Sequence, residues 1–181
     1  MQRTVRPLEG TSCMRFRLPV FVSALVLLAA VTAPAAELDD IRRLADEGQQ
    51  DAALRRLDER LVRDPSDVPA RFLKGSILLQ TGKLGEAREA FDEVTRRAPK
   101  LPEPYNNLAV IYAAQGDYEK ARQSLYTAAQ QAPDYAAAQI NLGDLYVKLA
   151  VDAYRRALEL NPADEASRAK LLALDAMFRR Q

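Results

Sequence analysis

Three residue types recur in this chain at a spacing of 34. The recurring residues are Gly48, Gly82 and Gly116; Ala53, Ala87 and Ala121; and Pro65, Pro99 and Pro133. Apolar residues three and four apart stand before each glycine and again between each alanine and proline, as one face of a helix requires. Glycine can end a helix in left-handed backbone, and proline cannot continue one. Each copy therefore predicts two helices joined by a tight turn, and the period predicts a stack of such hairpins.

The clearest copy covers residues 105–133. Its characteristic residues are Tyr105, Asn106, Asn107, Leu108, Ala109, Tyr112, Gly116, Asp117, Tyr118, Ala121, Leu125, Ala128 and Pro133. In this order they resemble the tetratricopeptide repeat. Residues 71–99 form a second copy that departs from the family pattern mainly at Arg71, and residues 38–65 form a more degenerate first copy. The resemblance implies an all-α solenoid whose concave groove, lined by the first helix of each repeat, holds peptides or partner helices.

A fourth copy, residues 140–162, lacks its middle. Five residues that match 116–120 of the third copy are deleted, and the turn is deleted with them. Apolar residues then follow one helix face without a break, at Leu142, Tyr146, Leu149, Ala153, Ala157 and Leu160. We therefore expect one long helix over residues 134–160. Asp164 is a residue type that begins helices, so residues 163–181 predict a C-terminal capping helix on the array of three full repeats and a shortened fourth.

The segment before the repeats has the layout of a secretory signal peptide. Arg15 and Arg17 precede the uncharged apolar run 18–31, and Ala33 and Ala35 satisfy the small-residue rule for cleavage. We expect a signal peptide over residues 1–35, with translation starting at Met1 or at Met14, and a repeat domain over residues 36–162. The alternative is an uncleaved membrane anchor, which the short apolar run disfavours because a spanning helix needs about 20 apolar residues. Either way the repeats are expected in an exported compartment, the bacterial periplasm.

Composition argues against catalysis and against nucleic-acid binding. The chain carries 26 basic and 25 acidic residues, which is too balanced for a polyanion-binding surface. It has no histidine, so histidine-based triads and mixed zinc sites are excluded, and its single cysteine, Cys13, lies in the expected leader. Its glycines form no phosphate-binding loop. We expect no enzyme activity, no cofactor and no metal.

The resemblance, carried over position by position, implies which residues face the groove. These are Leu38 and Arg42 in the first copy; Phe72, Ser76, Leu79 and Gln80 in the second; Asn106, Asn107 and Val110 in the third; and Ile140, Asn141 and Asp144 in the fourth. Asn107 and Asn141 occupy equivalent positions, so their amides could clamp the backbone of an extended peptide. Asparagine could equally be the family's usual residue there. Phe72 could receive a partner's apolar side chain or pack into the neighbouring repeat.

The expected function is a non-enzymatic scaffold that binds a protein or peptide of the bacterial envelope. Two alternatives remain at this stage: a self-assembling structural protein of the envelope, and a repeat module tethered to the membrane by an uncleaved leader. Five tyrosines are expected to pack helices together instead of forming a binding cage: Tyr105, Tyr112, Tyr118, Tyr146 and Tyr154. The arginine pairs Arg55-Arg56, Arg96-Arg97 and Arg155-Arg156 are expected on a solvated convex face.

Overall fold

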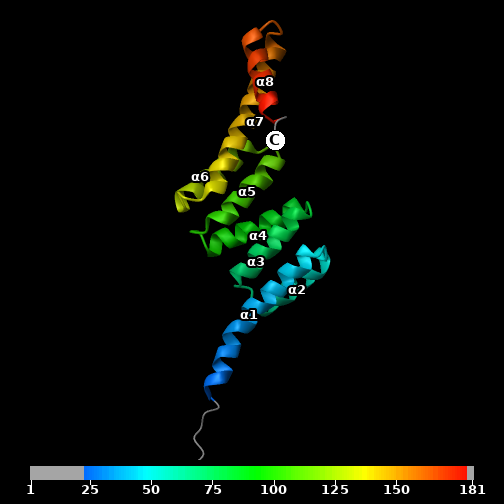
Figure 1. The fold of residues 1–181 in the computed structure, drawn as a ribbon, viewed down its shortest axis with the longest axis vertical. Coiled ribbons are helices and arrows are strands. Elements are labelled where there is room, and N and C mark those ends of the chain that lie inside the picture. Colours follow the sequence, from blue (N-terminus) through cyan, green and yellow to red (C-terminus); the bar gives the residue numbers. More distant parts are fainter. Residues whose placement is uncertain (1–22, 179–181) are drawn as a thin grey trace, which may run out of the picture. The chain divides into compact units, whose positions relative to one another are not determined.

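The computed structural model describes residues 23–178, and this part of the chain forms α-helices only (Figure 1). The helices are α1 Ser23–Asp46, α2 Gln50–Arg63, α3 Val68–Gln80, α4 Leu84–Arg97, α5 Pro102–Ala114, α6 Tyr118–Gln131, α7 Ala136–Leu160 and α8 Glu165–Phe178. The chain divides into two units, residues 1–37 and 38–181, and the repeat array lies in the second. The all-α solenoid predicted from the period is confirmed.

Helix boundaries follow the sequence period. The first helices of successive repeats, α3, α5 and α7, begin at Val68, Pro102 and Ala136, one period apart. The next helix, α8, begins at Glu165, five residues earlier than a full fourth repeat would place it. This shift equals the length of the deletion in the fourth copy. From α2 to α8 each helix packs against the next one in the chain (Figure 1). The first helices of neighbouring repeats, α5 and α7, also contact each other directly.

Glycine makes each of the three turns inside a repeat. The φ angles of Gly48, Gly82 and Gly116 are 83°, 74° and 79°, in the left-handed region that residues with a Cβ rarely adopt. At the third turn the Gly116 amide donates to the Ala113 carbonyl and the Asp117 amide donates to the Tyr112 carbonyl, which satisfies the last carbonyls of α5. The recurring glycine is therefore required by backbone geometry.

Replacing Gly116 with alanine should lower the free energy of unfolding by about 1 kcal/mol, because alanine must then hold left-handed backbone. Gly85 is the matched control: it lies in the first turn of α4 with no left-handed φ, and a Cβ there would meet open space. Gly85→Ala should leave stability unchanged or raise it. Urea unfolding of both variants checks the sign, and a Gly116→Ala variant as stable as the parent would contradict the argument.

Small residues allow the two helices of a repeat to approach closely. Ala53, Ala87 and Ala121 are each at most 1 % exposed. In the second repeat Gly75 lies against the Phe91 ring, where a Cβ would stand 2.9 Å from a ring carbon. Phe72 meets the same ring edge-on, with 5.6 Å between ring centroids. This aromatic packing fills the centre of the α3–α4 hairpin.

A buried ion pair joins the end of α2 to the start of α3. The Arg60 guanidinium donates to the Asp67 carboxylate through Nε at 2.7 Å and Nη2 at 2.6 Å, and the two side chains are only 11 % and 8 % exposed. The other oxygen of Asp67 accepts from the Ala70 amide at 2.8 Å and so caps α3. One carboxylate therefore both begins α3 and neutralises a buried cation.

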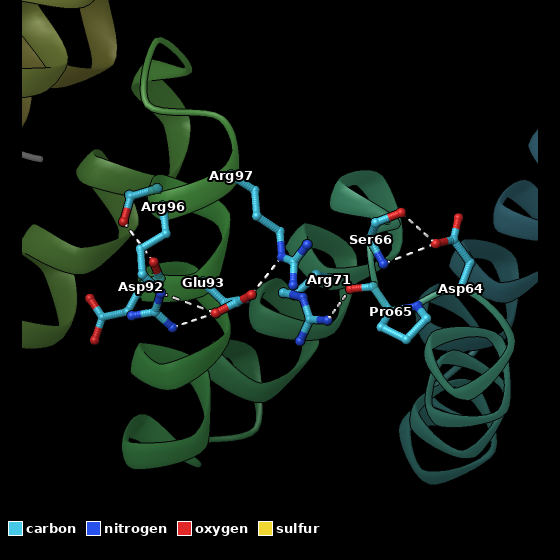
Figure 2. A network of polar contacts seen from close by, with 9 residues as sticks. Asp64, Pro65, Ser66, Arg71, Asp92, Glu93, Arg96 and Arg97 are labelled. Carbon is cyan, nitrogen blue, oxygen red and sulfur yellow. Dashed lines mark hydrogen bonds and ion pairs between the residues drawn. The ribbon is translucent and has the colours of Figure 1, made fainter.

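The loop beside this pair is held by further polar contacts, shown in Figure 2. The Ser66 hydroxyl and amide donate to the Asp64 carboxylate, and Arg71 donates to the Pro65 carbonyl at 2.7 Å. On α4, Glu93 accepts hydrogen bonds from Arg96 and Arg97. The arginine pairs of α2, α4 and α7 are all exposed, as expected for a solvated surface.

The fourth copy forms one uninterrupted helix, as predicted. α7 runs from Ala136 to Leu160, its first half packs against α5 and α6, and α8 packs against it (Figure 1). The Asp164 carboxylate accepts from the Ala166 and Ser167 amides and the Ser167 hydroxyl, so it begins α8 as expected. The predicted long helix and capping helix are both confirmed.

The prediction that Tyr146 packs between helices is wrong. Its side chain is 44 % exposed, and its hydroxyl shares a 2.6 Å hydrogen bond with the Tyr126 hydroxyl. The equivalent Tyr112 is partly buried in the core. In the third copy the second helix folds back, whereas in the fourth the chain continues straight past Tyr146, so nothing covers the ring.

The predicted signal peptide falls mostly on residues outside the described ones, and its cleavage and the choice of start at Met14 stay predictions. Within the described residues, none of the helices combines the length and the apolar character needed to cross a membrane.

Candidate functional site

A pocket of about 280 Å³ opens between α5, α6 and α7. Its lining comes from all three helices: Ala109, Val110 and Ala113 from α5; Tyr118, Ala121 and Leu125 from α6; and Asn141, Asp144, Leu145 and Lys148 from α7. We call it the α5–α7 pocket. Most of the lining is apolar, and the polar groups come from α7 apart from the Tyr118 hydroxyl of α6. An apolar hollow with a few polar groups is the usual form of a binding site.

At three positions in and beside the pocket the third repeat has smaller side chains than the second. Where the second repeat has Phe72, Leu79 and Phe91, the third has Asn106, Ala113 and Leu125. Phe91 is fully buried and fills the centre of the second hairpin, whereas leucine at position 125 is too short to do the same in the third. The fold thus supplies one filled and one open version of the same site.

Asn141 brings an amide to the pocket and is held in place by Asn106. The Asn141 amide nitrogen donates to the Asn106 carbonyl oxygen at 2.7 Å, and Asn106 is 8 % exposed. This bond orients the Asn141 side chain and leaves its carbonyl oxygen able to accept a hydrogen bond. A backbone N–H of a bound peptide is a suitable donor.

Lys148 and Asp144 add charges of opposite sign. Lys148 donates to the Asp152 carboxylate at 2.9 Å and its ammonium lies 5.9 Å from the centroid of the Tyr118 ring. The hydrogen bond to Asp152 raises the pKa of Lys148 above its ordinary value, so the ammonium stays charged at neutral pH. The paired charges fit a mixed polar ligand better than a strongly acidic or basic one.

Of the residues expected in the groove, the structure brings Val110, Asn141 and Asp144 together at the pocket. Asn106 lies behind Asn141, and Ile140 is 63 % exposed on the same helix. Asn107 is half-buried and does not line the pocket, so the hydrogen-bonded amides are Asn106 and Asn141 instead of the pair in equivalent positions.

The groove residues of the first two copies lie elsewhere. Phe72 and Leu79 pack against the core of their own repeat, and the Ser76 hydroxyl donates to the Phe72 carbonyl at 3.0 Å. Arg42 and Gln80 are exposed, and Arg42 is paired with Asp39. None of these side chains lines the α5–α7 pocket.

Sequence reasoning missed the other residues that line the pocket: Ala109, Ala113, Tyr118, Ala121, Leu125, Leu145 and Lys148. A signal was present, because Ala113 and Leu125 are smaller than their equivalents one period earlier. In the described part of the chain, no three acidic, histidine or cysteine side chains gather as a metal site would require.

Comparison with known proteins agrees with the fold. Tetratricopeptide repeat models match residues 38–102 and 101–163, which together span most of the chain. The TPR repeat-containing protein YvcD of Bacillus subtilis (strain 168) is 37 % identical over 87 residues, which are 48 % of this chain and only 16 % of YvcD. The chain therefore spans less than a fifth of this relative.

Solved structures show the same architecture at low identity. The type III secretion chaperone SycD of Yersinia enterocolitica, in complex with a peptide of the translocator YopD, has a TM-score of 0.60 at 14 % identity, over 65 % of this chain and 95 % of SycD. MamA has a TM-score of 0.57 at 20 % identity, over 73 % of this chain and 80 % of MamA. With the period, the helix order and the two model matches, these likenesses show that the chain belongs to the tetratricopeptide repeat family.

Proposed function

We propose that the protein is a non-enzymatic adaptor that holds a segment of another protein against α5 and α7, with one apolar side chain of that segment in the α5–α7 pocket. The observation that carries the proposal is the pocket itself, which opens where the equivalent site of the second repeat is filled by Phe91. Protein–protein interaction is the role that the family supports, and SycD is one member of this fold that has been solved with a peptide bound.

The size and chemistry of the pocket favour a single side chain as its occupant. Its volume of about 280 Å³ is below the range of pockets that enclose a whole small molecule. Alanine and leucine at its floor and the Tyr118 ring at its wall suit leucine, methionine or phenylalanine. The Asn141 carbonyl can then accept from the backbone of the same segment.

We place the adaptor in the bacterial periplasm and its partner among envelope proteins. The support is the leader-like layout of residues 1–35, with two arginines, an uncharged apolar run and small residues after it. The balance of charge and the lack of histidine support binding over nucleic-acid recognition or acid–base catalysis.

Filling the pocket should weaken binding while preserving the fold. The double variant Ala109→Gly/Leu125→Phe copies Gly75 and Phe91 into the third repeat, so its ring should occupy the pocket as Phe91 does one repeat earlier. Burying an apolar side chain contributes about 1.5–3 kcal/mol, so we expect affinity to fall about 10- to 100-fold. Peptides selected from a phage-displayed random library against the parent protein serve as probes, measured by fluorescence anisotropy.

Val62→Ala is the control, since Val62 is 81 % exposed on α2 and far from α7 in sequence and stacking order. It should bind the selected peptides like the parent. Ala113→Leu, which restores the counterpart of Leu79, provides a second filled pocket if the double variant unfolds. Unchanged binding by a folded filled variant would show that the pocket is not the site.

A further inference from the structure

Among the described residues, α7 has two faces that are mostly exposed, and they differ in character. One carries charges of both signs, as a solvated face does: Asp144, Lys148, Asp152, Arg155 and Glu159. The other carries no charge over almost the full helix and consists of Gly143, Tyr146, Ala150, Ala153, Ala157 and Leu160. We call the second set the uncharged face. Its members are three and four residues apart, so they form one continuous stripe.

The uncharged face is open to solvent. Tyr146 is 44 % exposed and Leu160 is 78 % exposed, Gly143 and Ala153 are also exposed, and only Ala150 and Ala157 are half-buried. Leu142 and Leu145 on a neighbouring face pack against α5 and α6, and Val151 is buried on the side where α8 packs. These neighbours therefore cover the stripe only in part, and α6 reaches it where the Tyr126 hydroxyl meets the Tyr146 hydroxyl.

Equivalent residues of the third repeat face each other inside a hairpin. Shifted by one period, Gly143 and Tyr146 correspond to Ala109 and Tyr112 of α5; after the deletion is allowed for, Ala150 and Ala157 correspond to Ala121 and Ala128 of α6. Ala109, Ala121 and Ala128 are at most 2 % exposed. The fourth copy thus keeps both sides of a helix–helix contact but places them on one straight helix, where they cannot meet.

One pair of equivalent residues, a glycine and an aromatic ring, shows which side chains such a contact would bring together. In the second repeat Phe91 packs on Gly75 so closely that a Cβ would stand 2.9 Å from the ring. The equivalent residues of the fourth copy are Gly143 and Tyr154, which lie about 16 Å apart along α7. A Cβ on Gly143 would meet nothing within 4 Å, although glycine inside a helix costs about 1 kcal/mol relative to alanine. Within one chain nothing accounts for this glycine.

We propose that two copies of the chain pair antiparallel along α7, each laying the second half of the helix on the first half of the other. Four members of the uncharged face are symmetric about position 148, so antiparallel pairing sets Tyr146 opposite Ala150 and Gly143 opposite Ala153, with Tyr154 beside Gly143. Each copy thereby regains the hairpin contact that its own deleted turn prevents. The same patch serves on both copies, so the assembly closes at two.

This pairing is independent of the proposed binding function. The α5–α7 pocket uses Asn141, Asp144, Leu145 and Lys148, which lie on other faces of α7 than the uncharged stripe. Two pockets would remain open in the pair. A failure of peptide binding would therefore leave the pairing untouched, and a monomeric protein would leave the adaptor role untouched.

Light scattering coupled to size exclusion tests the proposal on the protein produced from the full chain. The parent should have the mass of two chains at micromolar concentration. Inserting Gly-Asp-Tyr-Glu-Lys, the residues at 116–120, between Leu149 and Ala150 restores the turn and should give the mass of one chain. Gly143→Arg should also give one chain, because arginine fits the open space of a monomer but not a packed pair, whereas the control Gly85→Arg should stay paired.

Disulfide trapping tests whether the two α7 helices of the pair run antiparallel. In a Cys13→Ser background, Gly143→Cys and Ala153→Cys should each stay uncross-linked alone, and an equal mixture of the two should give a covalent dimer under mild oxidation. Two such cysteines of one helix are too far apart to bridge each other. A monomeric parent, a Gly143→Arg variant that remains dimeric, or cross-linking of either single variant alone would overturn the antiparallel pair.

Discussion

Replacing Asp67 with alanine is expected to lower the free energy of unfolding by about 3–5 kcal/mol, the range seen when one partner of a buried ion pair is removed. The change leaves the Arg60 guanidinium, whose side chain is 11 % exposed, in the core without the carboxylate that faces it at 2.6 Å. It also removes the acceptor that holds the Ala70 amide at the start of α3. Desolvation of the buried guanidinium in the absence of this carboxylate makes the larger contribution.

Urea denaturation followed by circular dichroism measures this loss, and two further variants separate its causes. Asp117→Ala removes a cap from α6, but its carboxylate pairs only with exposed Lys120, so this variant should lose much less stability. Arg60→Met in the Asp67→Ala background removes the buried guanidinium and should recover part of the loss. If Asp67→Ala and Asp117→Ala were equally stable, the buried pair would contribute nothing beyond the cap.

Much of the fold could be predicted from the sequence because the residues that end helices and make turns act locally. Left-handed glycine and helix-ending proline act within a few residues, so the turns at Gly48, Gly82 and Gly116 and the boundaries between repeats follow from residue type. The long α7 could be predicted for the same reason, since a missing turn is visible as missing residues. The Arg60–Asp67 ion pair was not predicted. The positions two periods later hold uncharged residues, Ala128 and Tyr135, so the difference was visible in the sequence.

The candidate site could be predicted only in part because a hollow depends on volumes contributed by three helices. Position by position, the family resemblance named Val110, Asn141 and Asp144, which the structure brings together at the α5–α7 pocket. It could not show that Leu125 leaves space where Phe91 does not, nor that neighbouring first helices are offset so that Asn141 meets Asn106 instead of Asn107. The other groove residues and the export of the protein stay predictions.

Tyr146 shows where reasoning by equivalent positions fails. A residue packs like its equivalents only while the surrounding helices keep the same arrangement, and the deletion changes that arrangement without changing the residue. The prediction of a straight helix and the prediction of a buried Tyr146 were therefore incompatible. The structure has the straight helix, and Tyr146 is exposed. The exposed ring and the uncharged stripe beside it are two consequences of one deletion.

Replacing Phe91 with alanine is expected to lower the free energy of unfolding by about 3–5 kcal/mol, as truncation of fully buried aromatic side chains does. Phe91 is 0 % exposed, contacts Gly75 and meets the Phe72 ring edge-on, so its removal leaves a cavity that neither neighbour can fill by a rotamer change alone. Hydrogen exchange should show where the loss falls. In a stack each repeat contacts only its neighbours, so amides of α3 and α4 should lose the most protection and those of α8 the least.

Tyr126→Ala is the matched control, because it truncates an aromatic side chain that is 43 % exposed on α6. Its effect should stay within about 1 kcal/mol. The open pocket of the third repeat gives this comparison its meaning: the third repeat has leucine at position 125 and an open pocket, whereas Phe91 fills the equivalent place in the second repeat. If Phe91→Ala were as mild as Tyr126→Ala, the second repeat would be as adaptable as the third, and its filled centre would not be what distinguishes the two sites.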